Sequence, residues 1–96
     1  MGRYIIKINN LYFEWSTIVD APVTCAMDKI ELETYIKDKY GREGLDTLPA
    51  RLERVKKNGT SAYGLTLDEL IKSNRAGNNE KCLTKEEIYK EYLGQG

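Results

Sequence analysis

Small polar side chains gather at residues 15–24, where the second of two apolar segments gives way to a loop. Ser16 and Thr17 offer hydroxyl groups, and Asp20 offers a carboxylate. The end of a strand holds such groups rigidly, as a binding site requires. The same residues also suit a plain turn, because Asp-Ala-Pro at 20–22 is a typical turn sequence and Asp often hydrogen-bonds to its own backbone.

Three arginine side chains have the chemistry to bind phosphate. Arg51 and Arg54 lie three residues apart, so they share one face of a helix, and Arg75 lies in a polar loop. A guanidinium group binds phosphate through two parallel hydrogen bonds. Alternatively, Arg51 and Arg54 belong to a solvated helix face and pair with Glu53 or with acidic residues of the preceding helix.

A glycine followed by two hydroxyl residues forms a further polar segment, Gly59-Thr60-Ser61. Such a loop can form a nest of backbone N–H groups that binds an anion. The spacing is not that of a P-loop, and no Lys-Ser or Lys-Thr pair follows the glycine. A helix C-cap followed by a connecting loop explains the same residues.

Aromatic residues could complete a pocket built from these segments. Trp15 or Tyr63 could stack on a base, and Asp20 could accept a hydrogen bond from a ribose hydroxyl or a base amine. Arginines and small hydroxyl residues recur in separate segments, as a composite pocket would need. The residues expected to contact a ligand are Trp15, Ser16, Thr17, Asp20, Arg51, Arg54, Thr60, Ser61 and Arg75.

The composition argues against several classes of function. The chain has no histidine, which removes the commonest general base, the usual partner of Ser and Cys nucleophiles, and the commonest metal ligand. We therefore expect no catalysis, no metal and no cofactor; acid–base chemistry would need Glu14, Asp20 and Glu80 to converge. Fifteen Lys and Arg balance fifteen Asp and Glu, so general nucleic-acid binding is not expected.

The length and the distribution of apolar residues predict one cytosolic domain over residues 1–96. No apolar run is long enough to cross a membrane, and the first residues become polar too soon for a secretory signal. Cys25 and Cys82 lie far apart and lack metal-binding spacing, so we expect both to be reduced thiols.

The apolar alternation over residues 3–18 predicts a β-hairpin. Asn9 and Asn10 can both take the positive φ that a two-residue turn requires. This register places Tyr4, Ile6, Ile8, Leu11, Phe13 and Trp15 on one face. The other face, which carries Glu14, is mixed and could be solvated. A lone two-stranded sheet also has open edges that a second copy could extend, so we expect a homodimer.

Capping boxes predict the starts of three helices. They lie at residues 28–31, 66–69 and 84–87. A further helix is expected to begin at Asp46 or Thr47, with Pro49 in its first turn, after Gly41 ends the preceding helix. The predicted fold class is α+β, with an N-terminal antiparallel β-hairpin packed by about four short helices.

The succession of residues 15–22, 51–54, 59–61 and 74–80 resembles small uncharacterised proteins of tailed bacteriophages. The likeness covers most of the chain and implies a protein made in the host cytoplasm during infection. Small phage proteins of this kind often counter bacterial defence, either by sequestering a nucleotide signal or by blocking a defence protein.

The residues and the resemblance together lead us to expect a protein that binds and sequesters a phosphate-bearing nucleotide signal without catalysis. Arg51, Arg54 and Arg75 would take the phosphates, and the hydroxyl residues would donate hydrogen bonds. The alternative is an anti-CRISPR-like inhibitor that binds a bacterial defence protein or host enzyme, which zero net charge and small size suit equally well. A third hypothesis is that the protein is a structural component of the virion.

Overall fold

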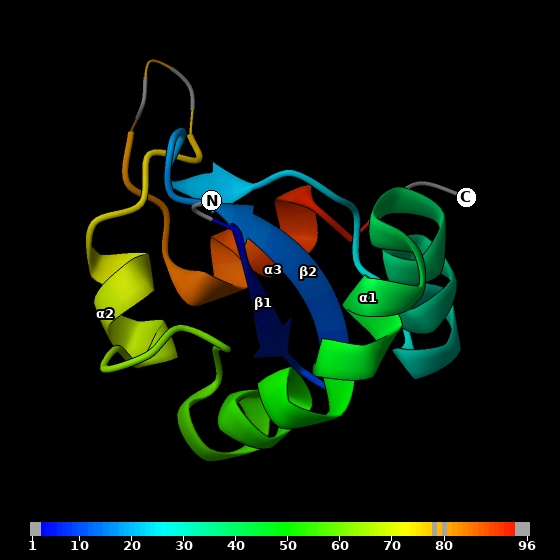
Figure 1. The fold of residues 1–96 in the computed structure, drawn as a ribbon. Helices are drawn as coiled ribbons and strands as arrows, with labels where there is room; N and C mark the ends of the chain where they lie inside the picture. Colours follow the sequence, from blue (N-terminus) through cyan, green and yellow to red (C-terminus); the bar gives the residue numbers. More distant parts are fainter. Residues whose placement is uncertain (1–2, 78, 80, 94–96) are drawn as a thin grey trace.

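The structure is a computed structural model that describes residues 3–77, 79 and 81–93 (Figure 1). The elements in order are β1 (Arg3–Ile8), β2 (Leu11–Ser16), β3 (Ala21–Pro22), α1 (Lys29–Asn58), α2 (Leu67–Lys72) and α3 (Lys85–Glu91). The strands form one antiparallel sheet in the order β1-β2-β3. The predicted α+β class with an N-terminal antiparallel sheet is confirmed.

The predicted hairpin forms with the predicted register. Asn9 and Asn10 take φ values of 51° and 68°, which produce the tight turn. The pairs on the apolar face are Tyr4 with Trp15, Ile6 with Phe13, and Ile8 with Leu11. This face packs against α2 and α3 in a core that contains Ile6, Ile8, Phe13, Trp15, Leu67, Leu70 and Ile88.

Most of the second face of the sheet is covered as well, since Ile5, Glu14 and Ser16 are buried, so the expectation that it could be solvated is wrong for these positions. Lys7 and Tyr12 on the same face are half-buried. This face packs against α1 in a separate core of Ile5, Met27, Leu32, Ile36, Leu48 and Val55. Buried residues recur along both halves of this long helix, which lets it cover the whole face. The sheet is thus the middle layer between α1 on one side and α2 with α3 on the other (Figure 1).

The first two predicted helices are joined in the single element α1. Gly41 has non-helical φ and ψ of 72° and −161°, so the predicted break at this residue is present as a kink between two helical parts of α1. Helical backbone resumes directly after this residue, so the described chain has three helices instead of about four. Of the two interpretations of residues 59–61, the helix C-cap is present, because Gly59 has φ of 79° and its N–H donates to the Val55 carbonyl at 2.7 Å.

All three predicted capping boxes are present. Asp28, Thr66 and Thr84 each accept a hydrogen bond from the backbone N–H three residues later, and the glutamate at that position binds back to the cap. These contacts depend on four consecutive residues each, which is why the sequence could locate them.

The short strand β3 was not predicted, because a two-residue strand that contains proline has no alternation to reveal it. Asp20 does make a turn, with φ of 53°. The next residues, Ala21 and Pro22, then pair with Ser16 and Trp15 at the end of β2.

Both edges of the hairpin are covered by other parts of the chain. On the β1 side, the Ser61 N–H donates to the Ile5 carbonyl at 2.8 Å. On the β2 side, β3 and Met27 occupy the edge, and the Tyr12 N–H donates to the Met27 carbonyl at 2.7 Å. The open edges on which the homodimer prediction rested are therefore occupied by the chain itself.

Candidate anion-binding site

A buried carboxylate lies between the sheet and α1. The Glu14 side chain is 0% exposed. Its Oε1 accepts hydrogen bonds from Arg3 Nη1 at 2.9 Å and from the Tyr35 hydroxyl at 2.5 Å, and its Oε2 accepts one from the Tyr40 hydroxyl. Lys39 Nζ lies 3.8 Å from Oε1. From the sequence, this carboxylate is only a possible acid or base, whereas the structure gives both of its oxygens hydrogen-bond partners.

The contacts of Glu14 fix its protonation state. Burial alone would raise its pKa, but hydrogen bonds from Tyr35, Tyr40 and Arg3 and the charge of Lys39 lower it overall. Burial and the bond to Glu14 raise the pKa of Tyr40 to about 12 and move that of Tyr35 in the same direction. Near neutral pH the carboxylate is ionised and both phenols remain protonated donors.

A pocket of about 340 Å³ opens beside this network, lined by Arg3, Tyr40, Thr47 and Arg51. This volume is at the lower end of the range typical of small-molecule sites. Two guanidinium groups supply positive charge, and Thr47 supplies a hydroxyl. Tyr40, a residue that is 38% exposed, contributes an aromatic ring. Among the described residues that line the pocket there is no carboxylate, so its chemistry suits an anion with an aromatic part.

Arg51 is half-buried, and within the described part of the chain it forms no hydrogen bond or ion pair. Burial lowers its pKa and the nearby Arg54 charge adds to this effect, while Tyr40 and Glu14 oppose it. Placing a cation partly out of water without a protein partner is unfavourable. Such an arrangement is more typical of a binding site than of a structural contact.

Arg54 lies one helical turn beyond Arg51 and is held in place by two contacts. Its Nε donates to the Ser61 carbonyl at 2.7 Å. Its guanidinium carbon lies 4.1 Å from the centre of the Tyr63 ring, and Tyr63 is 80% exposed. The structure therefore places Arg51 and Arg54 next to each other, as the spacing predicted, and adds Tyr63 to them.

Asp20 and Arg75 also meet, although 55 residues separate them. Arg75 Nε lies 3.1 Å from Asp20 Oδ2, and Arg75 Nη2 donates to the Ile18 carbonyl at 2.9 Å. The backbone N–H of Arg75 donates to the Asp20 carbonyl at 2.8 Å. Together these contacts brace the turn between β2 and β3, and neither residue lines the pocket beside Arg51.

The other residues predicted to contact a ligand either lie in the core or have side chains that hydrogen-bond to backbone groups. Trp15 is 1% exposed and packs in the core under α2 and α3, so its ring faces protein. Ser16 Oγ accepts from the Ile18 N–H, and Ser61 Oγ accepts from the Ile5 N–H.

Two further predicted contacts, Thr60 and Thr17, do not line the pocket beside Arg51 either. Thr60 is fully buried at the edge of β1, where it bridges Ile6, and its Oγ1 accepts from the Ala62 N–H. Thr17 is half-buried in the turn. Glu80, considered for acid–base chemistry, lies outside the described residues.

Three pocket residues were not singled out from the sequence. From the sequence, Thr47 is expected only as a helix cap, and no local pattern marks Tyr40 or Arg3 as part of a site. A usable signal existed for Arg3, because the predicted register puts it on the same face as Glu14 and diagonal to it. Oppositely charged side chains at diagonal positions can form an ion pair. Where a helix covers that face of the sheet, such an ion pair becomes a buried polar cluster.

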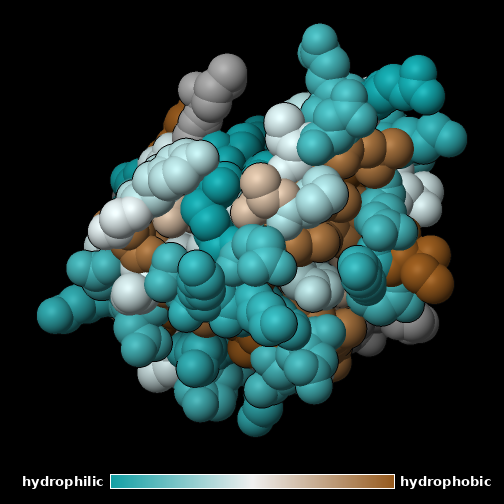
Figure 2. Space-filling view, turned by 60° about the horizontal axis from the view of Figure 1, so that its bottom comes forward, coloured by the Kyte–Doolittle hydropathy of each residue, from teal (hydrophilic) through white to brown (hydrophobic). Residues whose placement is uncertain are grey.

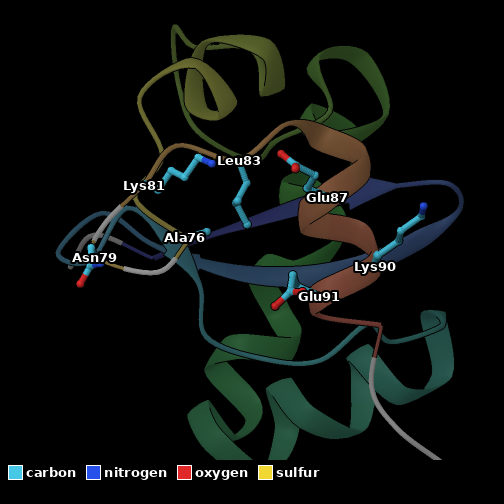
Figure 3. A pocket seen from close by; sticks show the side chains of 8 residues that line it. Ala76, Asn79, Lys81, Leu83, Glu87, Lys90 and Glu91 are labelled. Carbon is cyan, nitrogen blue, oxygen red and sulfur yellow. The ribbon is translucent and has the colours of Figure 1, made fainter.

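A larger hollow of about 500 Å³ lies between α3 and the loop before it (Figure 3). Its lining residues are Ala76, Gly77, Asn79, Lys81, Leu83, Glu87, Lys90 and Glu91. Two lysines and two glutamates cancel in charge, and Figure 3 shows Lys90 pointing away from Lys81 and Glu87. The smaller pocket beside Arg51 is therefore the better candidate for a ligand.

Hydrophobic side chains also reach the surface, in separate small areas among hydrophilic ones on the face shown in Figure 2. At the turn between β2 and β3, Ile18 is 77% exposed and Val19 is also exposed. Exposed apolar side chains on a braced turn are features that a protein partner can recognise.

The described residues contain no group of His, Cys, Asp and Glu that could hold a metal ion. Cys25 and Cys82 are exposed free thiols. None of the helices in residues 3–77, 79 and 81–93 combines the length and hydropathy of a membrane span. No model of a known protein family matches the chain, and neither the curated proteins nor the solved structures give a match.

Proposed function

We propose that this protein binds a small phosphate-bearing nucleotide in the pocket lined by Arg3, Tyr40, Thr47 and Arg51, and sequesters it without catalysis. The observation that carries this proposal is Arg51, a half-buried guanidinium with no partner among the described residues, next to a second arginine and an exposed aromatic ring. Phosphate would satisfy the guanidinium groups, and the ring would contact the base.

The charges around the pocket favour an anion. Arg3, Lys39 and Arg51 contribute three positive charges, and Glu14 contributes one negative charge. The Glu14 oxygens are buried and already accept hydrogen bonds, whereas Arg3 and Arg51 line the pocket, so positive charge remains available to a ligand there. Two surplus positive charges match a phosphate that carries nearly two negative charges near neutral pH.

The same geometry argues for binding rather than turnover. A general base works best when its pKa lies near the operating pH. The pKa of Glu14 is lowered and that of Tyr40 is raised to about 12, so neither group exchanges protons readily near neutrality. The two arginines stay protonated and can only donate.

The resemblance to small phage proteins supplies a biological setting for this proposal. A nucleotide sponge made in the host cytoplasm would lower the free concentration of a signal on which a bacterial defence depends. To capture the signal one molecule at a time, the protein must bind it tightly and be present in sufficient amount, but it needs no catalytic residue.

Calorimetric titration with inorganic phosphate, AMP, ADP-ribose and cyclic dinucleotides tests the proposal directly. At least one nucleotide should bind, and Arg51→Ala should weaken it at least tenfold, as expected for loss of a charge-assisted hydrogen bond of roughly 1.5–3 kcal/mol. Arg42→Ala is the matched control, because it removes the same charge from an exposed site on α1 outside the pocket lining. Equal effects of the two variants, or no binding across the panel, would refute the proposal.

Mass spectrometry of small molecules released by heating would identify a natural ligand. The protein should be purified from bacteria with an active nucleotide-signalling defence. A phosphate-bearing compound that is retained by the wild type and by Arg42→Ala, but absent from Arg51→Ala, is the expected result.

A second candidate function is a protein-binding inhibitor, favoured by the exposed Ile18 and Val19 on the turn that Arg75 braces. This candidate predicts a stable complex with a bacterial protein that survives Arg51→Ala and is lost in Ile18→Ser. The reverse pattern would support the nucleotide pocket.

A further inference from the structure

The cationic surface of the proposed pocket continues along α1 to a second aromatic ring. Arg51 and Arg54 are one turn apart on the same helix face, and their charges affect each other. Arg54 in turn lies against the Tyr63 ring. Arg3, Tyr40 and Arg51 line one pocket, and Arg54 with Tyr63 follows one helical turn further along α1.

The sheet edge fixes the position of this second half. Arg54 is anchored on the Ser61 carbonyl, and Ser61 pairs with Ile5. Ile5 is two residues from Arg3 along β1, so their side chains point to the same face of the sheet. Arg54 is thereby held beside the part of β1 that supplies the first pocket.

The Tyr63 ring is ready to stack on a planar group. Arg54 covers one of its faces at 4.1 Å, and the ring remains 80% exposed, which leaves the other face open. Within the described residues the terminal nitrogens of Arg54 have no hydrogen-bond partner, since only its Nε is engaged. An exposed ring backed by a guanidinium is a common platform for nucleobases.

We propose that the ligand is a dinucleotide unit, with one base against Tyr40, phosphate on Arg3, Arg51 and Arg54, and the second base on the open face of Tyr63. This inference rests on the proposed nucleotide-binding function and specifies its ligand class. A mononucleotide would occupy only the Tyr40 end and leave Tyr63 unused. The unit can come from a free dinucleotide or from an internal step of a single strand, which present the same two bases and linking phosphate.

The test compares AMP, 5′-phosphorylated diadenylate and octa-adenylate by calorimetric titration. The wild type should bind diadenylate at least tenfold more tightly than AMP. Tyr63→Ala should weaken diadenylate binding about five- to 150-fold, as expected for the loss of one base–aromatic stack, and leave AMP binding unchanged. Tyr63→Phe keeps the ring and should retain the affinity for diadenylate. Both changes are at an exposed side chain, and fluorescence of the buried Trp15 can verify that the variants are folded.

The outcomes separate this inference from the function on which it rests. The dinucleotide inference is wrong if AMP and diadenylate bind with equal affinity and Tyr63→Ala weakens neither. If Arg51→Ala still weakens both ligands in that case, the proposed nucleotide pocket remains supported. If neither ligand binds, or Arg51→Ala has no effect, the pocket itself is wrong. Where the inference holds, equal affinity per site for octa-adenylate identifies a strand as the source, and weaker binding identifies a free dinucleotide.

Discussion

The Tyr35 hydroxyl donates a 2.5 Å hydrogen bond to Glu14 Oε1, which ties the first part of α1 to the central strand of the sheet. The same oxygen also accepts from Arg3 on β1. One ionised carboxylate therefore joins two strands and a helix inside a layer that is otherwise apolar. A carboxylate so enclosed stabilises the fold only while its partners remain in place.

Replacing Tyr35 with Phe should lower the free energy of unfolding by about 1.5–3 kcal/mol, the usual contribution of a hydrogen bond to a charged group. The ring is kept, so the packing loss is small. Urea denaturation followed by the fluorescence of Trp15, the single tryptophan, measures the change. Tyr63→Phe removes a hydroxyl from an exposed side chain and should leave the midpoint where it is. Equal midpoints for the two variants would contradict the role given to Tyr35.

Acid should remove the contribution of Glu14 to stability. Its pKa in the folded protein is below the usual value of 4.5, so its stabilising contribution is complete above that value and is lost as the pH falls through the folded-state pKa. The difference in unfolding free energy between wild type and Glu14→Gln should therefore shrink as the pH falls from about 5 to about 3. Urea titrations of both proteins across this range measure it, and a difference that stays constant would count against the assignment.

Arg51→Met should separate stability from binding. A half-buried cation without a partner among the described residues is replaced by an apolar side chain of similar length, so the free energy of unfolding should stay the same or rise by about 0.5–1 kcal/mol. Nucleotide binding should be lost at the same time. Arg42→Met at an exposed position should change neither quantity. Clear destabilisation by Arg51→Met would show that Arg51 is a structural residue.

Gly59→Ala should be more destabilising than Gly64→Ala. Both glycines have positive φ, 79° and 71°, so both variants suffer the same backbone strain of about 1 kcal/mol. A Cβ at Gly59 would also lie 2.7 Å from Leu67 Cβ, whereas a Cβ at Gly64 would meet open space. We expect an additional loss of about 1–3 kcal/mol for Gly59→Ala from this overpacking, measured by thermal or urea unfolding. Similar losses for both would mean that Leu67 can move away.

The parts of the fold that follow local rules could be predicted from the sequence. Asn9 and Asn10 set the hairpin turn, and with it the register of six strand pairs. The capping boxes at Asp28, Thr66 and Thr84 need only four residues each. Interactions over this range depend little on the rest of the chain.

The candidate site could be predicted only in part. Arg51 and Arg54 were found because guanidinium groups three residues apart share a helix face. Tyr40 was missed because the partner of its hydroxyl, Glu14, lies 26 residues away, and only tertiary packing brings the two together. The hydroxyl of Ser61 was assigned to a ligand because nothing local shows that it accepts from the Ile5 N–H, 56 residues earlier.

The closure of the β1 edge by residues 59–61 also governs when the protein can fold during its synthesis. A two-stranded hairpin is marginally stable in water. The hydrogen bonds at the outer edge of β1 connect it to residues more than 50 positions later, so they cannot form until the ribosome has released that segment. Until then part of α1 is also still inside the ribosome, so the second face of the hairpin, which α1 covers, remains partly exposed. Folding of the N-terminal strands is thereby coupled to translation of the middle of the chain, and the emerging polypeptide passes through an interval in which chaperones can bind it.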